Sequence, residues 1–176
     1  LGAMCLYWVG STDMTSMQIS EVSFEEFVGM AEPRLRHALV AAVGRDRGRE
    51  ATAEALAYGW EHWSDLREMA NPVGYLYRVG RSRVRVRRHR LDFAVAALND
   101  AAVAGSGRIP EFEPSLPDAL TRLSEKQRVS VFLVYAMDWS RRDVADLLGI
   151  SVNSVGSHLE RGLHKLRRQL GVSIRG

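Results

Sequence analysis

The sequence of 176 residues contains a single cysteine, Cys5. One thiol forms no internal disulfide and builds no thiolate zinc cage, which is typical of proteins from a reducing compartment. Long apolar runs are missing as well, since no stretch approaches the roughly 18 residues that a membrane-spanning helix needs. These absences exclude a disulfide-bonded scaffold and a transmembrane protein, and we expect a soluble cytoplasmic protein.

Patterns that carry catalysis or metal binding are also scarce. There is no carboxylate cluster and no glycine-rich phosphate loop, and the histidines are scattered without ligand spacing. They are His37, His62, His89, His158 and His164. The sequence therefore predicts neither an enzyme nor a bound metal or other cofactor.

What the sequence does have is an uneven distribution of charge. The net charge is only +3, but residues 71–90 contain seven arginines and no acid. Asn71 and Pro72 predict a helix start, and we expect one helix from there to Arg90. Its inward stripe would consist of Val73, Leu76, Tyr77, Gly80 and Val84.

The arginines of this predicted helix repel one another unless an anionic partner is present. A solvated face usually mixes both signs of charge, and a membrane-bound helix would need a free apolar face. We therefore favour nucleic acid as the partner. The candidate DNA-binding residues are Arg78, Arg81, Arg83, Arg85, Arg87 and Arg88.

A second DNA-binding pattern lies between Ser140 and Arg161. Ser140 can cap a first helix with an apolar stripe, Gly149 breaks that helix, and Ser151 can cap a second one. The apolar residues of the second helix are Val152, Val155 and Leu159. This pattern predicts a helix-turn-helix, whose second helix enters a major groove. An ordinary helical hairpin with a solvated polar face is the alternative.

The other faces of the second helix carry the candidate base-reading and phosphate-binding residues. Asn pairs with adenine in bidentate fashion, and cations that trail the helix meet phosphates beside the groove. The predicted residues are Ser151, Asn153, Ser154, Ser157, His158, Arg161 and Lys165.

The remaining segments predict an all-α protein of two small helical domains. We expect an N-terminal tail (1–22), a helix bundle (23–92), a flexible linker rich in Gly, Ser and Pro (93–117), and the helix-turn-helix domain (118–172). Ser23 and Glu26 predict a capping box, and residues 45–50 read as a charged loop. We expect Trp60 and Trp63 in the core of the bundle, and Ala136 in that of the second domain.

Residues 123–170 resemble region 4 of the sigma-70 family, through LSEKQRVSVFLVYAMDWSRRDVADLLGISVNSVGSHLERGLHKLRRQL. NPVGYLYRVGRSRVRVRRHR resembles the end of region 2 in its extracytoplasmic-function group. Response-regulator output domains share the region 4 pattern but have a receiver domain upstream. The resemblance implies a region 2-like and a region 4-like domain that read the minus-ten and minus-thirty-five promoter elements.

The resemblance also implies partners and further sites. Region 2 would grip the clamp of core RNA polymerase through Glu50, Glu54 and Trp60, and region 4 would dock on the flap. Residues 64–70 would hold a flipped base, with Tyr75, Tyr77 or Trp63 as stacking faces. The family often has an anti-sigma factor as a further partner.

The sequence departs from the family pattern at several positions. Ala53 stands where the family usually has a clamp-binding amide, and Val86 and Gly156 replace a common Asp and a common Lys.

Because of the resemblance, the favoured function is a sigma factor of the extracytoplasmic-function type. The alternative is a sigma-like DNA-binding regulator that no longer programmes RNA polymerase.

Overall fold

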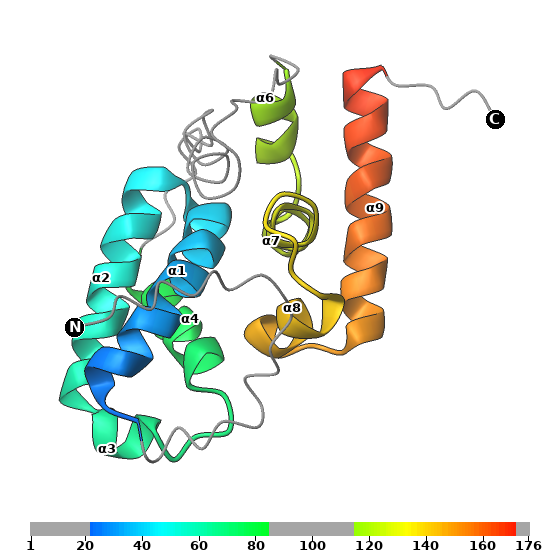
Figure 1. Cartoon of the computed structure of the whole chain (residues 1–176). Coiled ribbons are helices and arrows are strands. Elements are labelled where there is room, and N and C mark those ends of the chain that lie inside the picture. The colour runs from blue at the N-terminus through cyan, green and yellow to red at the C-terminus, as the bar shows by residue number, and fades with distance from the viewer. Residues whose placement is uncertain (1–21, 85–114, 172–176) are drawn as a thin grey trace, which may run out of the picture.

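The computed structural model describes residues 22–84 and 115–171, and it contains no strand within these two ranges. The helices are α1 (Phe24–Val43), α2 (Arg45–Glu61), α3 (Trp63–Leu66), α4 (Pro72–Arg83), α6 (Leu116–Thr121), α7 (Glu125–Tyr135), α8 (Arg141–Leu148) and α9 (Val152–Leu170). The predicted all-α fold, with one helical part before residues 85–114 and one after, is confirmed (Figure 1). Residues 1–21 of the predicted tail and residues 93–114 of the predicted linker lie outside the described residues.

Helix α1 begins with the predicted capping box. The Ser23 hydroxyl accepts from the Glu26 N–H at 3.2 Å, and the Ser23 N–H donates to the Glu26 carboxylate at 3.0 Å. The helix continues through Pro33 and ends at Gly44, whose φ of 92° turns the chain directly into α2. Because the chain turns so tightly, α1 and α2 pack against each other as neighbours.

The predicted loop over residues 45–50 is wrong, since these residues form the first turns of α2. Gly48 explains the difference. A Cβ atom at this position would lie 2.5 Å from the Cα of Val40, so the absent side chain lets α2 cross closely over α1. Of the charged residues that indicated a loop, Asp46, Arg49 and Glu50 are exposed, while Arg45 and Arg47 are half-buried.

The predicted burial of Trp60 is also wrong, because its side chain is 61% exposed. Its ring meets that of Phe24 in a T-shaped arrangement, with 5.3 Å between the ring centroids. Trp63 lies deeper, half-buried against Phe27 at 4.9 Å. Helix α2 ends at Glu61, so the two tryptophans are not on one continuous helical stripe.

Helix α4 starts as predicted, with Pro72 in its first turn and the Asn71 side chain accepting from the Gly74 N–H at 2.7 Å. Its inward stripe is buried as far as Gly80, where a Cβ would lie 2.7 Å from the Ala51 carbonyl oxygen of α2. The prediction of helix beyond Arg83 is wrong at Val84, which is extended with a ψ of 104°. Residues 85–90 lie outside the described residues.

In the second part, α7 packs against α9 and α8, and the three helices share buried valines and leucines. Two of the predicted core positions are wrong. Ala136 is the exposed C-cap of α7, and Val152 is 46% exposed because it belongs to the first turn of α9. The side chains that fill this core are Leu123, Val129, Leu133, Val144, Val155 and Leu159.

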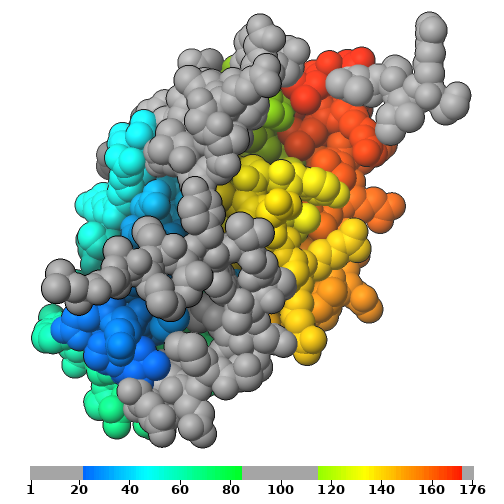
Figure 2. Space-filling model, viewed as in Figure 1, coloured from blue at the N-terminus to red at the C-terminus, as the bar shows by residue number. Residues whose placement is uncertain are grey.

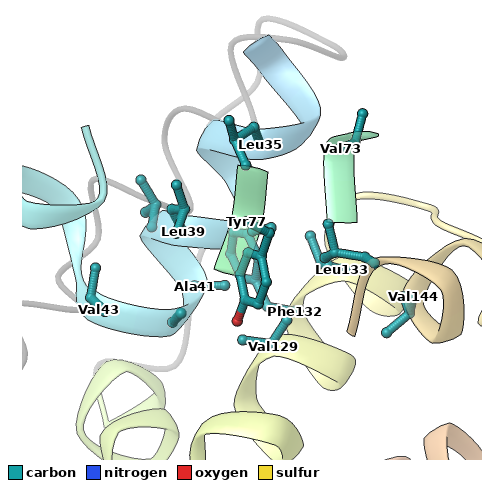
Figure 3. Packing of buried hydrophobic residues seen from close by; sticks show 14 of the residues in the cluster. Leu35, Leu39, Ala41, Val43, Val73, Tyr77, Val129, Phe132, Leu133 and Val144 are labelled. Carbon is teal, nitrogen blue, oxygen red and sulfur yellow. The ribbon is translucent and has the colours of Figure 1, made fainter. Parts of the chain in front are cut away.

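The two helical parts pack directly against each other. Helix α7 lies on α1 and helix α8 lies on α4, so the apolar core continues from Leu35 and Leu39 to Phe132 and Leu133 (Figure 3). Arg128 of α7 is only 4% exposed and donates to the carbonyl oxygens of Ala41 and Ala42, at 2.8 and 2.7 Å. The contact between the parts is thus both apolar and hydrogen-bonded.

Candidate nucleic-acid interface

Helices α8 and α9 form the predicted helix-turn-helix. Ser140 and Asp143 make the capping box of α8, and Gly149 ends that helix in the left-handed region with a φ of 63°. The Ile150 N–H donates to the Ala145 carbonyl at 3.0 Å, which closes the turn. This tight turn holds α9 at a fixed angle to α8, as a groove-binding helix requires.

The N-terminal half of α9 presents a polar face. Ser151 caps the helix by accepting from the Ser154 N–H at 3.1 Å, and the two hydroxyls lie 2.8 Å apart. Asn153, Ser157 and Arg161 are exposed, and there is no acid in the first turn. Helix α9 forms one flank of the molecule, on the side away from α2 (Figure 2). These residues are therefore accessible to a DNA groove.

His158 and Lys165 are half-buried rather than exposed. Lys165 donates to the Gln127 side-chain oxygen of α7 at 3.2 Å, so its ammonium is held against the protein. Nδ1 of His158 is buried without a hydrogen-bond partner among the described residues. Burial and then the neighbouring charges of Arg161 and Lys126 lower the pKa of His158. Its imidazole is thus neutral near pH 7.

The described arginines of α4 differ in their surroundings. Arg78 and Arg83 are exposed, and their guanidinium groups lie 5.8 Å from the Tyr75 ring and 5.4 Å from the Tyr58 ring. Arg81 is half-buried and forms an ion pair with Glu125 at the start of α7. Arg85, Arg87 and Arg88 lie outside the described residues. Two of the predicted arginines therefore face solvent, and a third faces the other part of the protein.

Comparison with known proteins decides what the second part is. Residues 115–166 match the family model described as sigma-70, region 4. This part of the chain is therefore similar to sigma-70 region 4 domains, and it is called the region 4 domain below. The match includes α6, α7, α8 and most of α9, so the sequence-based resemblance is confirmed there.

A solved structure extends the likeness beyond the region 4 domain. It is the co-crystal structure of the sigma factor RpoE in complex with the anti-sigma factor NepR from Bartonella quintana. The match has a TM-score of 0.57 and 19% sequence identity, and covers 85% of this chain and 98% of that chain. The chain therefore has the fold of a sigma factor. A search of curated proteins returned no match. The family model and the solved structure both describe sigma factors, which are not enzymes, in agreement with the sequence-based expectation.

The predicted stacking aromatics are less accessible than the arginines. Tyr77 is only 5% exposed and contacts Glu125 through its hydroxyl, at 3.4 Å. Burial and then the charge of Glu125 raise its pKa. Tyr75 is half-buried, with its hydroxyl 3.1 Å from that of Tyr58. Among the three predicted faces, Tyr77 is unavailable to a base in this structure.

The segment predicted to hold a flipped base begins inside a short helix. Residues 64–66 belong to α3, and Leu66 is 1% exposed, which anchors the segment to the core. The charged residues around it, Asp65, Arg67 and Glu68, are exposed. The segment is thus fixed at its centre and polar at its surface.

The predicted polymerase-contacting residues lie on the outer face of α2. Glu50, Ala53 and Trp60 are exposed, and Glu54 is half-buried. The small residues Ala53 and Ala57 lie among Glu50, Glu54 and Trp60 on this side of the helix. The face therefore combines negative charge with an apolar surface. The face points away from the region 4 domain, because α1 and α4 lie between them (Figure 1).

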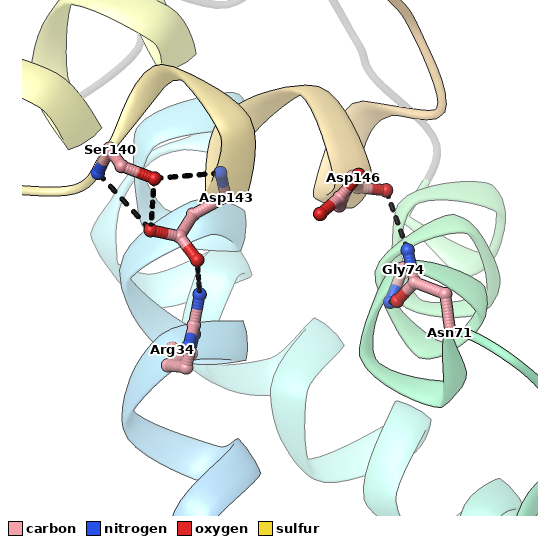
Figure 4. Close-up of polar contacts among 6 residues, drawn as sticks. All are labelled: Arg34, Asn71, Gly74, Ser140, Asp143 and Asp146. Carbon is pink, nitrogen blue, oxygen red and sulfur yellow. Dashed lines mark hydrogen bonds and ion pairs between the residues drawn. The ribbon is translucent and has the colours of Figure 1, made fainter. Parts of the chain in front are cut away.

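The sequence did not predict the polar contacts that join the region 4 domain to the first part. Arg34 of α1 pairs with Asp143 at 3.0 Å, and its guanidinium lies 4.4 Å from the Trp139 ring. The Asn71 amide donates to the Asp146 carbonyl at 2.7 Å (Figure 4). These partners are 109 and 75 residues apart, and nothing in the sequence pattern links residues so distant.

Within residues 22–84 and 115–171, no group of histidine, cysteine and acidic side chains is placed to hold a metal ion. None of the helices in these ranges has the length and apolarity to cross a membrane.

Proposed function

We propose that this protein is an RNA polymerase sigma factor of the extracytoplasmic-function type. The observation that carries the proposal is the region 4 domain, whose α9 exposes Asn153, Ser157 and Arg161 in a helix-turn-helix. In this function α9 reads the minus-thirty-five element, while α4 and the arginines that follow it act at the minus-ten element. Both steps take place in the cytoplasm.

In α9, different side chains have different tasks. Asn153 offers a bidentate contact to adenine, and the Ser157 hydroxyl suits either a base edge or a phosphate. Arg161 binds a phosphate or a guanine edge. Ser151 and Ser154 act through the helix N-terminus, where free N–H groups favour a phosphate.

At the minus-ten element, Arg78 and Arg83 contribute exposed positive charge beside tyrosine rings. This combination suits a strand being separated, because cations bind its phosphates and aromatic rings stack with its bases. Arg81, Arg85, Arg87 and Arg88 complete the set of proposed phosphate contacts. Arg81 has to leave Glu125 first.

Core RNA polymerase is the proposed protein partner, with its clamp on the outer face of α2 and its flap on the region 4 domain. Glu50, Glu54 and Trp60 supply the acids and the exposed ring. Ala53 lacks the amide of the family pattern, which motivates the second candidate, a DNA-binding regulator without polymerase. An anti-sigma factor is a further proposed partner, as the related RpoE was crystallised with NepR.

Run-off transcription with core RNA polymerase from the source bacterium tests the proposal. A pool of its promoters is transcribed with and without this protein, and we expect transcripts that depend on it and share upstream sequence. A Trp60→Ala variant, which changes an exposed residue, should lose polymerase-dependent transcripts but keep duplex binding. Duplex binding without any transcript from the unaltered protein would favour the regulator instead.

A further inference from the structure

Helix α9 carries a single acid, Glu160, among several cations. Glu160 is exposed, and it belongs to the helix that is proposed to enter a major groove, where every nearby phosphate is negative. A carboxylate in this place weakens binding to DNA in general, and it needs a favourable contact to offset the repulsion. The cations of the same helix are Arg161, Lys165, Arg167 and Arg168.

Glu160 lies on the same face of α9 as Asn153. It follows Asn153 by seven residues, which is nearly two full turns at 3.6 residues per turn, so both side chains leave the helix in almost the same direction. Ser157, between them, is exposed as well. Recognition helices present their base-contacting side chains over about two turns. Glu160 is thus within the span of α9 that can contact bases.

The Glu160 carboxylate is free to accept from a ligand. Within the described residues it takes part in no hydrogen bond or ion pair. Arg161 is its neighbour in the chain, and adjacent residues do not face each other on a helix. The Arg161 Nε donates to the Ser157 carbonyl at 3.0 Å, and the Lys165 ammonium donates to Gln127 at 3.2 Å. These two cations are therefore engaged elsewhere.

An ionised carboxylate only accepts hydrogen bonds, and this restricts what it can contact in a major groove. The base donors there are the amino groups at N4 of cytosine and N6 of adenine. Adenine also presents its N7 acceptor beside the amino group, which repels a carboxylate, whereas cytosine presents only the donor. Thymine and guanine present acceptors. A carboxylate on this face of α9 therefore favours cytosine.

We propose that Glu160 determines part of the sequence that α9 recognises, by accepting a hydrogen bond from N4 of a cytosine. The proposal rests on the proposed function and adds the identity of a base to it. Seven residues rise about 10 Å along the helix at 1.5 Å per residue, which corresponds to about three base pairs at 3.4 Å per pair. The cytosine should lie about three base pairs from the adenine that Asn153 contacts.

The test begins with selection of the preferred sequence from a randomised duplex by the unaltered full-length protein. Four duplexes are then made that differ only at the selected cytosine, and fluorescence anisotropy gives the affinity for each. We expect the unaltered protein to bind the cytosine duplex about 10-fold more tightly than the other three. Glu160→Ala should bind all four alike, because it loses the contact with cytosine and no longer repels the acceptors of guanine and thymine.

A matched pair of variants separates the contact from the effect of charge. Glu61→Gln and Glu160→Gln remove the same charge at two exposed positions, of which only the second is on α9. Glu61→Gln should keep the 10-fold preference for cytosine. Glu160→Gln should move the preference to adenine, since a glutamine amide pairs with N6 and N7 of adenine in bidentate fashion.

Three results would overturn the assignment of Glu160 and leave the proposed function intact. They are a selected sequence without this cytosine, a cytosine preference that survives in Glu160→Ala, and an equal gain in affinity for all four duplexes in that variant. Failure of the proposed function looks different. In that case the unaltered protein selects no sequence and supports no transcript with core RNA polymerase, and the base assignment falls with it.

Discussion

Arg128 donates from Nη2 to the carbonyl oxygen of Ala42, 86 residues earlier in the chain, at 2.7 Å. Its other nitrogens donate to Ala41 at 2.8 Å and to Leu123 at 3.2 Å. Ala41 and Ala42 belong to the last turn of α1, where carbonyl groups lack intrahelical donors. A buried cation thus completes the end of one helix from the other part of the protein, and burial lowers its pKa.

Replacing this cation should destabilise the whole protein. Arg128→Met keeps an apolar stem but leaves buried carbonyl groups without donors, and we expect a loss of about 2–4 kcal/mol in the free energy of unfolding. Urea unfolding followed by circular dichroism measures it. Arg122→Met changes an exposed arginine nearby and should cost less than about 0.5 kcal/mol. Equal effects would contradict a structural role for Arg128.

Two glycines should respond in opposite directions to the same substitution. A Cβ on Gly156 meets no atom within 4 Å, so Gly156→Ala removes only the entropic cost of glycine in α9. We expect it to stabilise by about 0.5–1 kcal/mol. Gly48→Ala forces Val40 and α2 apart and should destabilise by about 1–3 kcal/mol. Thermal unfolding compares the two, and a stabilising Gly48→Ala would refute the close crossing.

His158 should make duplex binding depend on pH. Its folded pKa lies below the usual 6.5, so the free protein binds fewer protons than the unfolded chain and loses stability as pH falls through that range. A nearby phosphate favours the protonated form, and affinity should therefore rise as pH falls from 7.5 to about 6. Fluorescence anisotropy at constant ionic strength measures this. Unaltered affinity across that range in the parent protein, or the same rise in His158→Gln, would exclude a proton-linked contact.

Asn153 should determine preference at one base position. Asn153→Ala is expected to lower affinity for the preferred sequence by about 1–3 kcal/mol and to leave affinity for sequences altered at that position unchanged. Arg161→Ala should instead weaken binding to every sequence and reduce the salt dependence by about one unit of slope. Competition binding with a randomised duplex distinguishes them. A uniform loss in Asn153→Ala would make it a positioning contact.

Asp143 should contribute a stability that disappears in acid. Burial by itself would raise its pKa, but hydrogen bonds from Ser140 and Arg34 outweigh burial and the pKa is lowered from 3.8. A carboxylate whose pKa is lowered by folding stabilises the folded protein at pH values above its unfolded pKa. This contribution to stability is lost as the pH falls through the folded pKa. Asp143→Asn should be less stable than the parent at pH 7 and equal to it near pH 2. Asp146→Asn, an exposed acid on the same helix, is the control.

Local structure was readable from the sequence wherever neighbouring residues decide it. Ser23 with Glu26 and Ser140 with Asp143 are three residues apart, so the capping boxes follow from the order of residues alone. The helix-turn-helix follows from Gly149 between two apolar stripes, since the left-handed turn and the helical period both act over a few residues. The all-α fold and the region 4 domain could be predicted for this reason.

Other features were decided by tertiary structure. Residues 45–50 look like a charged loop, and they are helical because Gly48 lies against Val40 of α1. Trp60 looks like a core residue, and it is 61% exposed because the helices that pack against α2 leave its ring in contact with Phe24 at the edge of the bundle. In both cases the deciding contact or boundary is set by how helices meet, and hydrophobic periodicity carries no information about that.

The sequence by itself determined most of the helices, the capping boxes at Ser23 and Ser140, and a set of candidate DNA-binding side chains, because each depends on residues within one or two turns. The tertiary structure alone decided which of these side chains are accessible. Arg81 and Arg78 look equivalent in the sequence, but Arg81 is paired with Glu125, 44 residues later, and Arg78 is exposed. The physical reason is that a charge is neutralised by whatever the packing of distant helices places beside it.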